Sequence, residues 1–251
     1  MSADAKAMLQ LEHVGFSYSS GIGLFGGTRI PALEDVSFQV REGETLGLIG
    51  RNGCGKSTLL RIMTGIFKAD TGRVLRNCDR ISLLSLGVAF DRLLSGSDNL
   101  ILSCMLLGAS RKEALAMHDE IVAYAELEEF IDQPVKTYSS GMKARLGFAV
   151  GMQMRADLIL IDEVLGVGDA RFRKKATETM RERIKSDQSV LFVSHSMPTV
   201  RSLCTRVVWL ERGRVHMEGD VNEVVEAYEL FMKEARGVGS GLRASEAPSS
   251  R

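Results

Sequence analysis

Hydrophobic and polar residues follow two different patterns along the chain. Short apolar runs predict β-strands, and apolar residues that recur every three to four positions predict α-helices. The expected strands are residues 8–18, 35–41, 45–50, 73–75, 80–84, 158–161, 190–193, 206–210 and 214–218. The expected helices are residues 56–65, 97–107, 111–130, 139–154, 170–186, 197–203 and 221–233. Because strands and helices alternate in the second half, the pattern predicts an α/β fold with a mainly parallel sheet covered on both faces.

Three segments depart from this alternation. Residues 86–155 are mostly helical in pattern, and we expect them to form an inserted helical subdomain. Residues 19–31 are rich in glycine, which predicts a loop. Residues 237–251 are rich in Gly, Ser, Ala and Pro, which predicts a disordered C-terminal tail. The remainder, residues 1–236 with the insertion, is expected to be one domain.

Composition narrows the class of protein only a little. The chain has 251 residues, 45% hydrophobic and 25% charged, which is ordinary for a globular protein. Lys and Arg number 32, as do Asp and Glu, so no bulk charge indicates a nucleic-acid partner. The four cysteines form no CxxC pair and are expected to be reduced thiols. No run of about 18 apolar residues occurs, so we do not expect the chain itself to span a membrane.

The most specific motif is a P-loop between an apolar strand and a helix. Its glycines let successive backbone N–H groups point at phosphate oxygens, and the helix N-terminus adds positive potential. Lys56 is expected to reach the β- and γ-phosphates, Ser57 to hold Mg²⁺, and Thr58 to bind a further oxygen. A chance Gly-rich turn is the alternative, and the flanking strand and helix argue against it. The nucleotide-binding residues are therefore Gly50, Arg51, Asn52, Gly53, Cys54, Gly55, Lys56, Ser57 and Thr58.

Two carboxylates follow the apolar strand at residues 158–161. The run has no period-two alternation, as expected for a strand buried on both faces. Asp162, at the carboxyl end of this strand, is expected to face the phosphates and hold Mg²⁺. Glu163 is expected to be the general base that polarises the attacking water. These acids could instead cap the following turn, but the preceding P-loop favours a catalytic site.

A further segment resembles the signature of the ABC ATPase family. Ser139, Ser140 and Gly141 match the Ser-Gly-Gly core of that signature, and Met142 stands where the family usually has Gln. The motif opens a predicted helix, so it is a second anion site as well as a possible Ser N-cap. The resemblance implies a P-loop NTPase fold, the ABC nucleotide-binding domain, with an antiparallel β subdomain and an inserted helical subdomain. It implies ATP and Mg²⁺ as cofactors.

The resemblance covers residues 9–233 and implies roles for three more residues. Tyr18 matches the aromatic residue that stacks on adenine, and Asp169 matches the acid of the D-loop. His195 matches the switch histidine that bonds the γ-phosphate, although a histidine at a strand end is often only structural. The family also implies a homodimer in which each signature contacts the ATP of the opposite protomer. Sequence spacing alone does not show whether the signature acts in cis or in trans.

One departure from the family concerns the glutamine on the strand that leads into the helical subdomain. No Gln occurs there, and Ser85 or Leu86 takes its place, depending on the alignment. The role of that glutamine in sensing Mg²⁺ and relaying to the membrane partner is therefore in doubt for this chain.

Several segments resemble one branch of the family, which exports O-antigen, capsule or teichoic acid. They are residues 86–90, 94–99, 162–169 and 193–197. The branch implies a separate transmembrane subunit, a lipid-linked glycan as cargo and a peripheral position at the cytoplasmic face of the inner membrane. A different cargo, such as a lipid or drug, is the main alternative. A soluble ABC ATPase and a non-enzymatic ATP-binding scaffold are further alternatives, and the presence of Lys56 and Glu163 argues against the scaffold.

Overall fold

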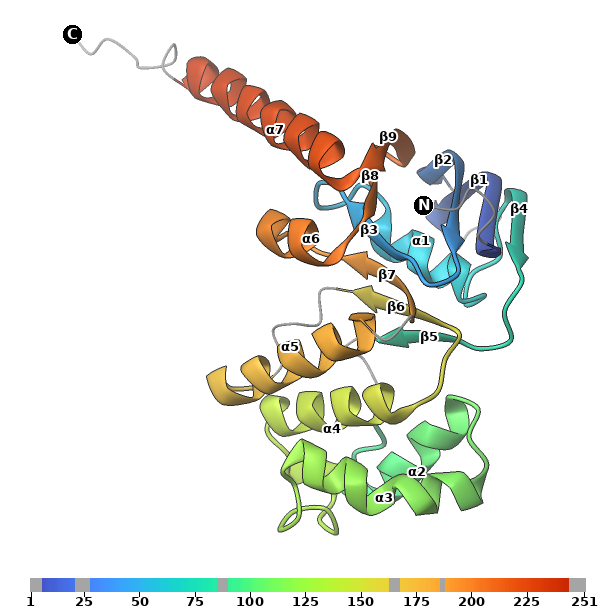
Figure 1. Ribbon diagram of the computed structural model, residues 1–251, viewed down its shortest axis with the longest axis vertical. Coiled ribbons are helices and arrows are strands. Elements are labelled where there is room, and N and C mark those ends of the chain that lie inside the picture. Colours follow the sequence, from blue (N-terminus) through green and yellow to red (C-terminus); the bar gives the residue numbers. More distant parts are fainter. Residues whose placement is uncertain (1–5, 21–27, 85–89, 163–167, 186–187, 244–251) are drawn as a thin grey trace, which may run out of the picture.

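The computed structural model describes residues 6–20, 28–84, 90–162, 168–185 and 188–243 (Figure 1). An antiparallel sheet stands at one side of the molecule, in the order β2-β1-β4. Its strands are β1 (Ala7–Ser20), β2 (Thr28–Arg41) and β4 (Thr71–Arg76). This is the antiparallel β subdomain that the family resemblance implies.

A six-stranded sheet, in the order β5-β6-β7-β3-β8-β9, forms the centre of the molecule. Neighbouring strands are parallel except for the pair β8 and β9, which are antiparallel. The mainly parallel sheet predicted from the strand–helix alternation is therefore confirmed. The strands are β3 (Thr45–Ile49), β5 (Ile81–Leu84), β6 (Leu158–Asp162), β7 (Ser189–Val193), β8 (Arg206–Glu211) and β9 (Arg214–Asp220).

Separate hydrophobic cores lie on the two faces of this sheet. In β6, Leu158 and Leu160 pack into the core shared with α1 (Lys56–Met63) and the antiparallel sheet. Ile159 and Ile161 pack into the opposite core. An uninterrupted apolar run is thus the consequence of burial on both faces. The helices that contribute to the opposite core are α4 (Ser140–Gln153), α5 (Ala170–Lys185), α6 (Met197–Leu203) and α7 (Val221–Arg243).

The inserted segment forms a helical subdomain with its own core. It contains α2 (Gly96–Leu106), α3 (Arg111–Ala125), the short 3-10 helix η1 (Val135–Thr137) and α4. Helix α4 belongs to both parts, because Phe148 packs against the central sheet and Ala149 packs into the helical core. Figure 1 shows α4 between α5 and the pair α2 and α3. Movement of the helical subdomain therefore involves α4 directly.

The largest differences from the predicted boundaries lie in three regions. Strands β1 and β2 extend into the predicted loop, since Ser19 pairs with Arg29 and Ser20 with Thr28. Helix α3 ends at Ala125 and not at residue 130, because Glu126 adopts a left-handed backbone with φ 56°. Helix α7 continues to Arg243, beyond the predicted end at residue 233. Glycine weakens a helix but keeps its N–H, so the helical hydrogen bonds can continue. Residues 244–251 lie outside the described residues.

Within the described ranges, none of the helices combines the length and the apolar character needed to cross a bilayer.

Candidate functional site

The P-loop joins the end of β3 to the start of α1, and its backbone requires glycine at two positions. Gly50 and Gly55 have φ values of 153° and 110°. A Cβ at Gly55 would lie 2.7 Å from the Ala32 carbonyl oxygen, and one at Gly50 would overlap the Leu210 carbonyl. Gly55 is also the N-cap of α1 and has no side chain to cap that helix. The first N–H groups of α1 are therefore left for a ligand.

The side chain of Lys56 lies inside this loop. The residue is buried, and its Nζ donates to the carbonyl oxygens of Gly50 at 2.8 Å and Arg51 at 3.0 Å. Nζ also lies 3.9 Å from the Cys54 Sγ. Burial raises the pKa of the Cys54 thiol, so Cys54 is a neutral neighbour of this cation. Lys56 therefore places an ammonium group in the centre of the loop.

A pocket of about 500 Å³ opens beside the P-loop. It brings together residues from the ends of three parallel strands, because β3, β6 and β7 finish at the same edge of the sheet. Asp162 comes from β6, and His195 follows β7. The lining residues are Tyr18, Ile30, Pro31, Ala32, Asn52, Gly53, Gly55, Lys56, Ser57, Thr58, Asp162 and His195.

Most of the predicted nucleotide-site residues thus meet in one place. Gly50, Arg51 and Cys54 are not in the lining, and they support the pocket through Lys56. Sequence reasoning missed the wall formed by Ile30, Pro31 and Ala32. The first two residues were assigned to a loop, and Ala32 was assigned to neither a loop nor a strand. Glu163 lies outside the described residues, so its role stays a prediction.

Tyr18 is fixed at the rim of this pocket. Its hydroxyl lies 2.9 Å from the Thr58 Oγ1. Its ring meets Phe16 edge-on at a centroid distance of 5.2 Å and Phe67 at 6.1 Å. The residue is 38% exposed, so one part of the ring is open to solvent. A partly exposed, well-supported aromatic ring suits a stacking platform for a planar group.

The oxygen atoms at the pocket fit a magnesium ion. Ser57 and Asp162 both line it, and Mg²⁺ usually takes one or two protein oxygens together with water and substrate phosphates. Among the described residues, no cluster of three or more His, Cys, Asp or Glu could form a metal cage by itself. The donor set therefore suits an ion that arrives with a phosphorylated substrate.

The signature residues form the N-terminal end of α4, away from this pocket. Ser139 is the N-cap of α4, and its Oγ accepts a hydrogen bond from the Met142 backbone N–H at 3.1 Å. The interpretation of Ser139 as a helix N-cap is compatible with its interpretation as part of an anion site, since the cap bond is formed and the residue is exposed. A Cβ at Gly141 would lie 3.9 Å from the Gly168 Cα. The signature therefore adjoins the segment that leads into α5.

Asp169 stands at the start of α5. Its Oδ1 accepts a hydrogen bond from the Phe172 N–H at 2.9 Å. This bond, followed by smaller effects that include the charges of Arg145 and Arg171, holds the pKa of the Asp169 carboxyl below its usual value. Asp169 is thus an ionised helix cap beside the signature.

Comparison with known proteins agrees with this geometry. Residues 33–166 match the sequence pattern of the ABC transporter family. The O-antigen export system ATP-binding protein RfbB of Klebsiella pneumoniae is 44% identical over 209 residues, which cover 83% of this chain and 85% of that protein. The teichoic acids export ATP-binding protein TagH of Staphylococcus haemolyticus is 38% identical over 81% of this chain and 76% of its own length. TagH of Lactococcus lactis is 43% identical over 80% of this chain but only 43% of its own length.

Solved structures confirm the predicted fold class. An ATP-binding subunit of an ABC transporter superposes with a TM-score of 0.72 and 23% identity, covering 89% of this chain and 94% of that one. The ATP-binding cassette MJ0796, in a dimeric post-hydrolysis state with ADP and Pi, gives a TM-score of 0.70 and 24% identity over 85% of this chain and 99% of its own. At this identity the two structures establish the fold.

Proposed function

Because this chain belongs to the ABC transporter family, we propose that it is the ATP-hydrolysing subunit of an exporter for lipid-linked surface polysaccharide. The observation that carries the proposal is the pocket in which Lys56 and Ser57 of the P-loop meet Asp162 and His195. The cargo follows from the relatives, whose names assign them to the export of O-antigen and of teichoic acids.

Phosphate binding would use the free N-terminal end of α1 and the ammonium group of Lys56. A lysine has three N–H donors, and two of them are engaged by the carbonyls of Gly50 and Arg51. The third, next to the weakly accepting Cys54 Sγ, can turn to a β- or γ-phosphate oxygen. The loop therefore orients Lys56 before a nucleotide arrives, which lowers the cost of ordering it.

The remaining groups would act on the terminal phosphate. Ser57 and Asp162 would hold Mg²⁺, which when bound offsets the negative charge of the phosphates. His195 would donate a hydrogen bond to a γ-phosphate oxygen, and Glu163 would take a proton from the attacking water as general base. Tyr18 would support the adenine by stacking.

The signature would act on a second molecule of this chain. Its Ser139 caps the N-terminal end of α4 and is absent from the lining of the pocket that holds Lys56. A homodimer in which each signature covers the opposite P-loop would join the two halves of the site. ATP binding would close this dimer and hydrolysis would reopen it.

A separate membrane subunit would dock on the helical subdomain. Leu102, Met105 and Leu106 follow each other at helical spacing on α2 and are 45%, 43% and 84% exposed. Apolar side chains collected on one exposed stripe mark a protein contact more often than a solvated surface. The chain would thus act at the cytoplasmic face of the inner membrane as a peripheral subunit.

Replacement of Glu163 by Gln tests the enzymatic part. We expect the Glu163→Gln variant to bind ATP but to lose turnover by about a hundredfold or more, since general bases contribute factors of this size. The variant should accumulate as an ATP-bound dimer on gel filtration. Glu178→Gln, an exposed acid on α5, is the matched control and should hydrolyse ATP normally. Unchanged turnover in Glu163→Gln would contradict the assignment.

Affinity purification from the native membrane tests the transport part. A multispanning membrane subunit should come down with the wild-type chain, and Leu106→Glu should lose it while keeping its own ATPase activity. Recovery of ribosomal proteins, or of no membrane protein at all, would limit the conclusion to ATP hydrolysis.

Accumulation of a lipid-linked glycan in cells lacking the chain would identify the cargo class, and accumulation of another lipid would favour the alternative cargo.

A further inference from the structure

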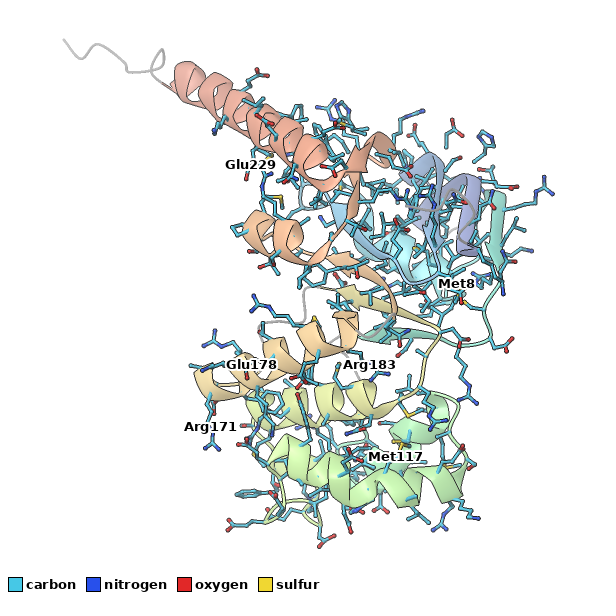
Figure 2. All side chains as sticks on the ribbon, viewed as in Figure 1. Met8, Met117, Arg171, Glu178, Arg183 and Glu229 are labelled. Carbon is cyan, nitrogen blue, oxygen red and sulfur yellow. The ribbon has the colours of Figure 1, made fainter. Side chains whose placement is uncertain are left out.

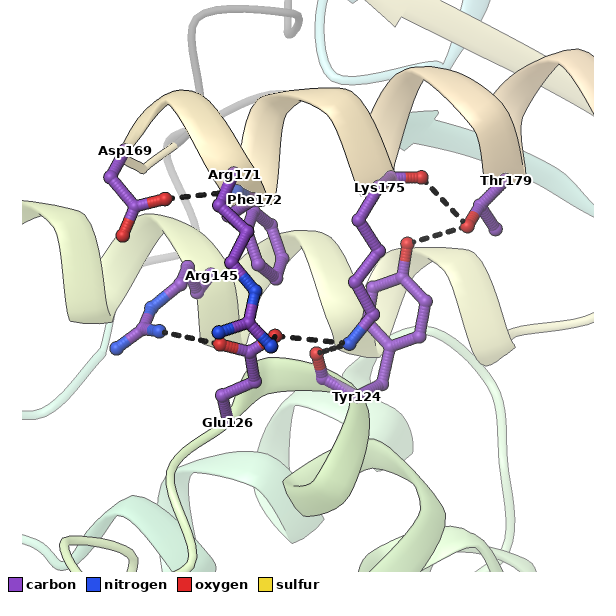
Figure 3. A network of polar contacts seen from close by, with 8 residues as sticks. All are labelled: Tyr124, Glu126, Arg145, Asp169, Arg171, Phe172, Lys175 and Thr179. Atoms are coloured by element: carbon purple, nitrogen blue, oxygen red, sulfur yellow. Dashed lines mark hydrogen bonds and ion pairs between the residues drawn. The ribbon is translucent and has the colours of Figure 1, made fainter.

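Glu126 lies where three helices meet, immediately after the end of α3. Its carboxylate lies 3.4 Å from the Lys175 Nζ, 3.6 Å from an Arg145 nitrogen and 4.0 Å from an Arg171 nitrogen (Figure 3). Arg145 belongs to α4, whereas Lys175 and Arg171 belong to α5. One carboxylate of the helical subdomain therefore faces three cations on the two helices that begin at the signature and at Asp169.

Lys175 attaches the last turn of α3 to α5. Its Nζ donates to the Tyr124 carbonyl oxygen at 2.9 Å and lies 4.5 Å from the centre of the Tyr124 ring. The carbonyl groups at a helix C-terminus lack helical partners and carry partial negative charge, so a lysine is a favourable cap there. The Tyr124 hydroxyl donates to the Thr179 Oγ1 at 2.8 Å. These contacts continue the link between α3 and α5 for a full turn.

Arg145 connects the same carboxylate to the signature. It lies three residues after Met142 on α4 and its side chain is 18% exposed. A Cβ at Gly168 would lie 3.3 Å from the Arg145 Cγ, so Arg145 also packs beside the residue preceding Asp169. Beneath it, Phe172 is buried against Tyr124 and Phe148. Helices α4 and α5 therefore share one charged and one aromatic contact region, both close to the start of α5.

The other ends of α4 and α5 are joined separately. Arg171 and Arg183 mark the two ends of α5, which runs along α4 (Figure 2). The Arg183 guanidinium donates to the carbonyl of Met152 and, at 2.6 Å, to that of Met154. It caps the C-terminus of α4. With both ends fixed, a shift of the helical subdomain moves the signature and Asp169 together.

We infer that Glu126 is a positioning residue for ATP hydrolysis: it fixes the signature and Asp169 relative to the end of α3 without contacting ATP. This inference rests on the proposed function. The left-handed backbone at Glu126, unusual for a residue other than glycine, places the carboxylate between α4 and α5. Loss of its charge should lower the rate at which the closed dimer hydrolyses ATP, while nucleotide binding to the P-loop should stay unchanged.

The test compares Glu126→Gln with Glu129→Gln. Glu129 is an exposed acid in the same connecting segment, so the two variants lose the same charge. We expect Glu126→Gln to lower kcat roughly three- to tenfold, the size of coupling effects in such networks. The KM for ATP and the Kd of a fluorescent ATP analogue for the monomer should stay within about twofold of wild type. Glu126→Asp keeps the charge and tolerates a left-handed backbone, so it should recover part of kcat.

Two further measurements separate positioning from a general loss of stability. A double-mutant cycle combines Glu126→Gln with Lys175→Gln. The fold loss in kcat of the double variant should be smaller than the product of the fold losses of the two single variants, because both remove the same contact. Amide hydrogen exchange at the first turns of α4 and α5 should rise in Glu126→Gln and not in Glu129→Gln, whether or not the chain hydrolyses ATP. If Glu126→Gln does not fold, the same exchange and kcat comparison is made with Glu126→Asp.

The outcomes distinguish this inference from the proposed function. An inactive wild-type chain with increased exchange in Glu126→Gln would reject the ATPase, and with it any role in hydrolysis. It would retain the link that Glu126 makes between α3 and the starts of α4 and α5. An active wild-type chain in which Glu126→Gln matches Glu129→Gln in kcat and exchange would overturn the inference and leave the ATPase intact. A loss of nucleotide affinity as large as the loss in kcat would also overturn it, because it would show an effect on the P-loop side.

Discussion

The N-terminal ends of α1 and α4 are both suited to bind anions, but they are prepared differently. Helix α1 begins after Gly55, which offers no side-chain cap, and its first residue is the buried Lys56. Helix α4 begins after Ser139, whose own hydroxyl accepts the Met142 N–H. The first end is thus ready for phosphate, whereas one N–H group of the second already bonds its own chain.

For the proposed ATPase cycle, the difference predicts an order of events. A nucleotide can bind to α1 without displacing a hydrogen bond of that helix end. A phosphate that reaches α4 must compete with, or add to, the cap formed by Ser139. Binding to one protomer should therefore come first, and contact with the signature should follow on closure of the dimer. Three predictions address this contrast.

Lys56→Met should have the largest effect on nucleotide binding, because it removes the positive charge at the N-terminal end of α1. Hydrogen bonds to charged groups contribute about 1.5–3 kcal/mol, so nucleotide affinity should fall about 10- to 100-fold. Isothermal titration with ATP measures this loss. Lys68→Met removes an exposed lysine beyond α1 and is the control. Equal ATP affinities of the two variants would contradict the proposed difference between the N-terminal ends of α1 and α4.

Ser139→Ala should have an intermediate effect that is confined to hydrolysis and stability. Loss of an N-cap costs about 1 kcal/mol, which lowers the Tm of a domain of this size by about 2–4 °C. Ser110→Ala removes the cap of α3, in which Ser110 and Glu113 form a capping box, and should cost a similar amount. Only Ser139→Ala should also lower kcat, and neither should change ATP binding to the monomer. A similar fall in kcat for both would mean that the signature acts through stability alone.

Asp169→Asn should have the smallest effect, and its pH dependence sharpens the comparison. The bond from Phe172 N–H lowers the folded pKa of Asp169 below the unfolded value. The resulting stability is fully present above the unfolded pKa of about 3.9 and is lost as pH falls through the folded pKa. The difference in unfolding free energy between wild type and Asp169→Asn should therefore close in acid. Urea unfolding between neutral pH and about pH 3 measures it. Glu178→Gln, on the same helix, is the comparison, and a difference that grows in acid would contradict the sign.

Contiguous motifs were the most predictable features of the site. The P-loop could be assigned from residues 50–57 alone, because its glycines and lysine act through local backbone geometry. Asp162 could be placed beside it because it ends a parallel strand, and the carboxyl ends of parallel strands share an edge. His195 was placed there by its resemblance to the switch histidine of the family. The confirmed family and fold agree with these assignments, while the roles of the individual site residues stay predictions.

Features set by distant contacts were not predictable. The wall formed by residues 30–32 depends on the pairing of β1 with β2, and no local pattern marked it as strand. The end of α3 depends on Glu126 and on Lys175, which is 49 residues further along the chain. Apolar spacing alone had extended α3 to residue 130. The place of the usual glutamine, Ser85 or Leu86, lies outside the described residues and stays open.

Mixing two inactive variants tests most directly whether the two helix ends meet across a dimer. Lys56→Met disables the P-loop, and Ser139→Glu places a negative charge at the signature. If each site combines the P-loop of one copy with the signature of another, a mixed dimer contains one intact site. An equal mixture should then recover about a quarter of the wild-type rate, since half of random dimers are mixed and each has one working site. A mixture no more active than the separate variants would show that the two helix ends do not complement each other in trans.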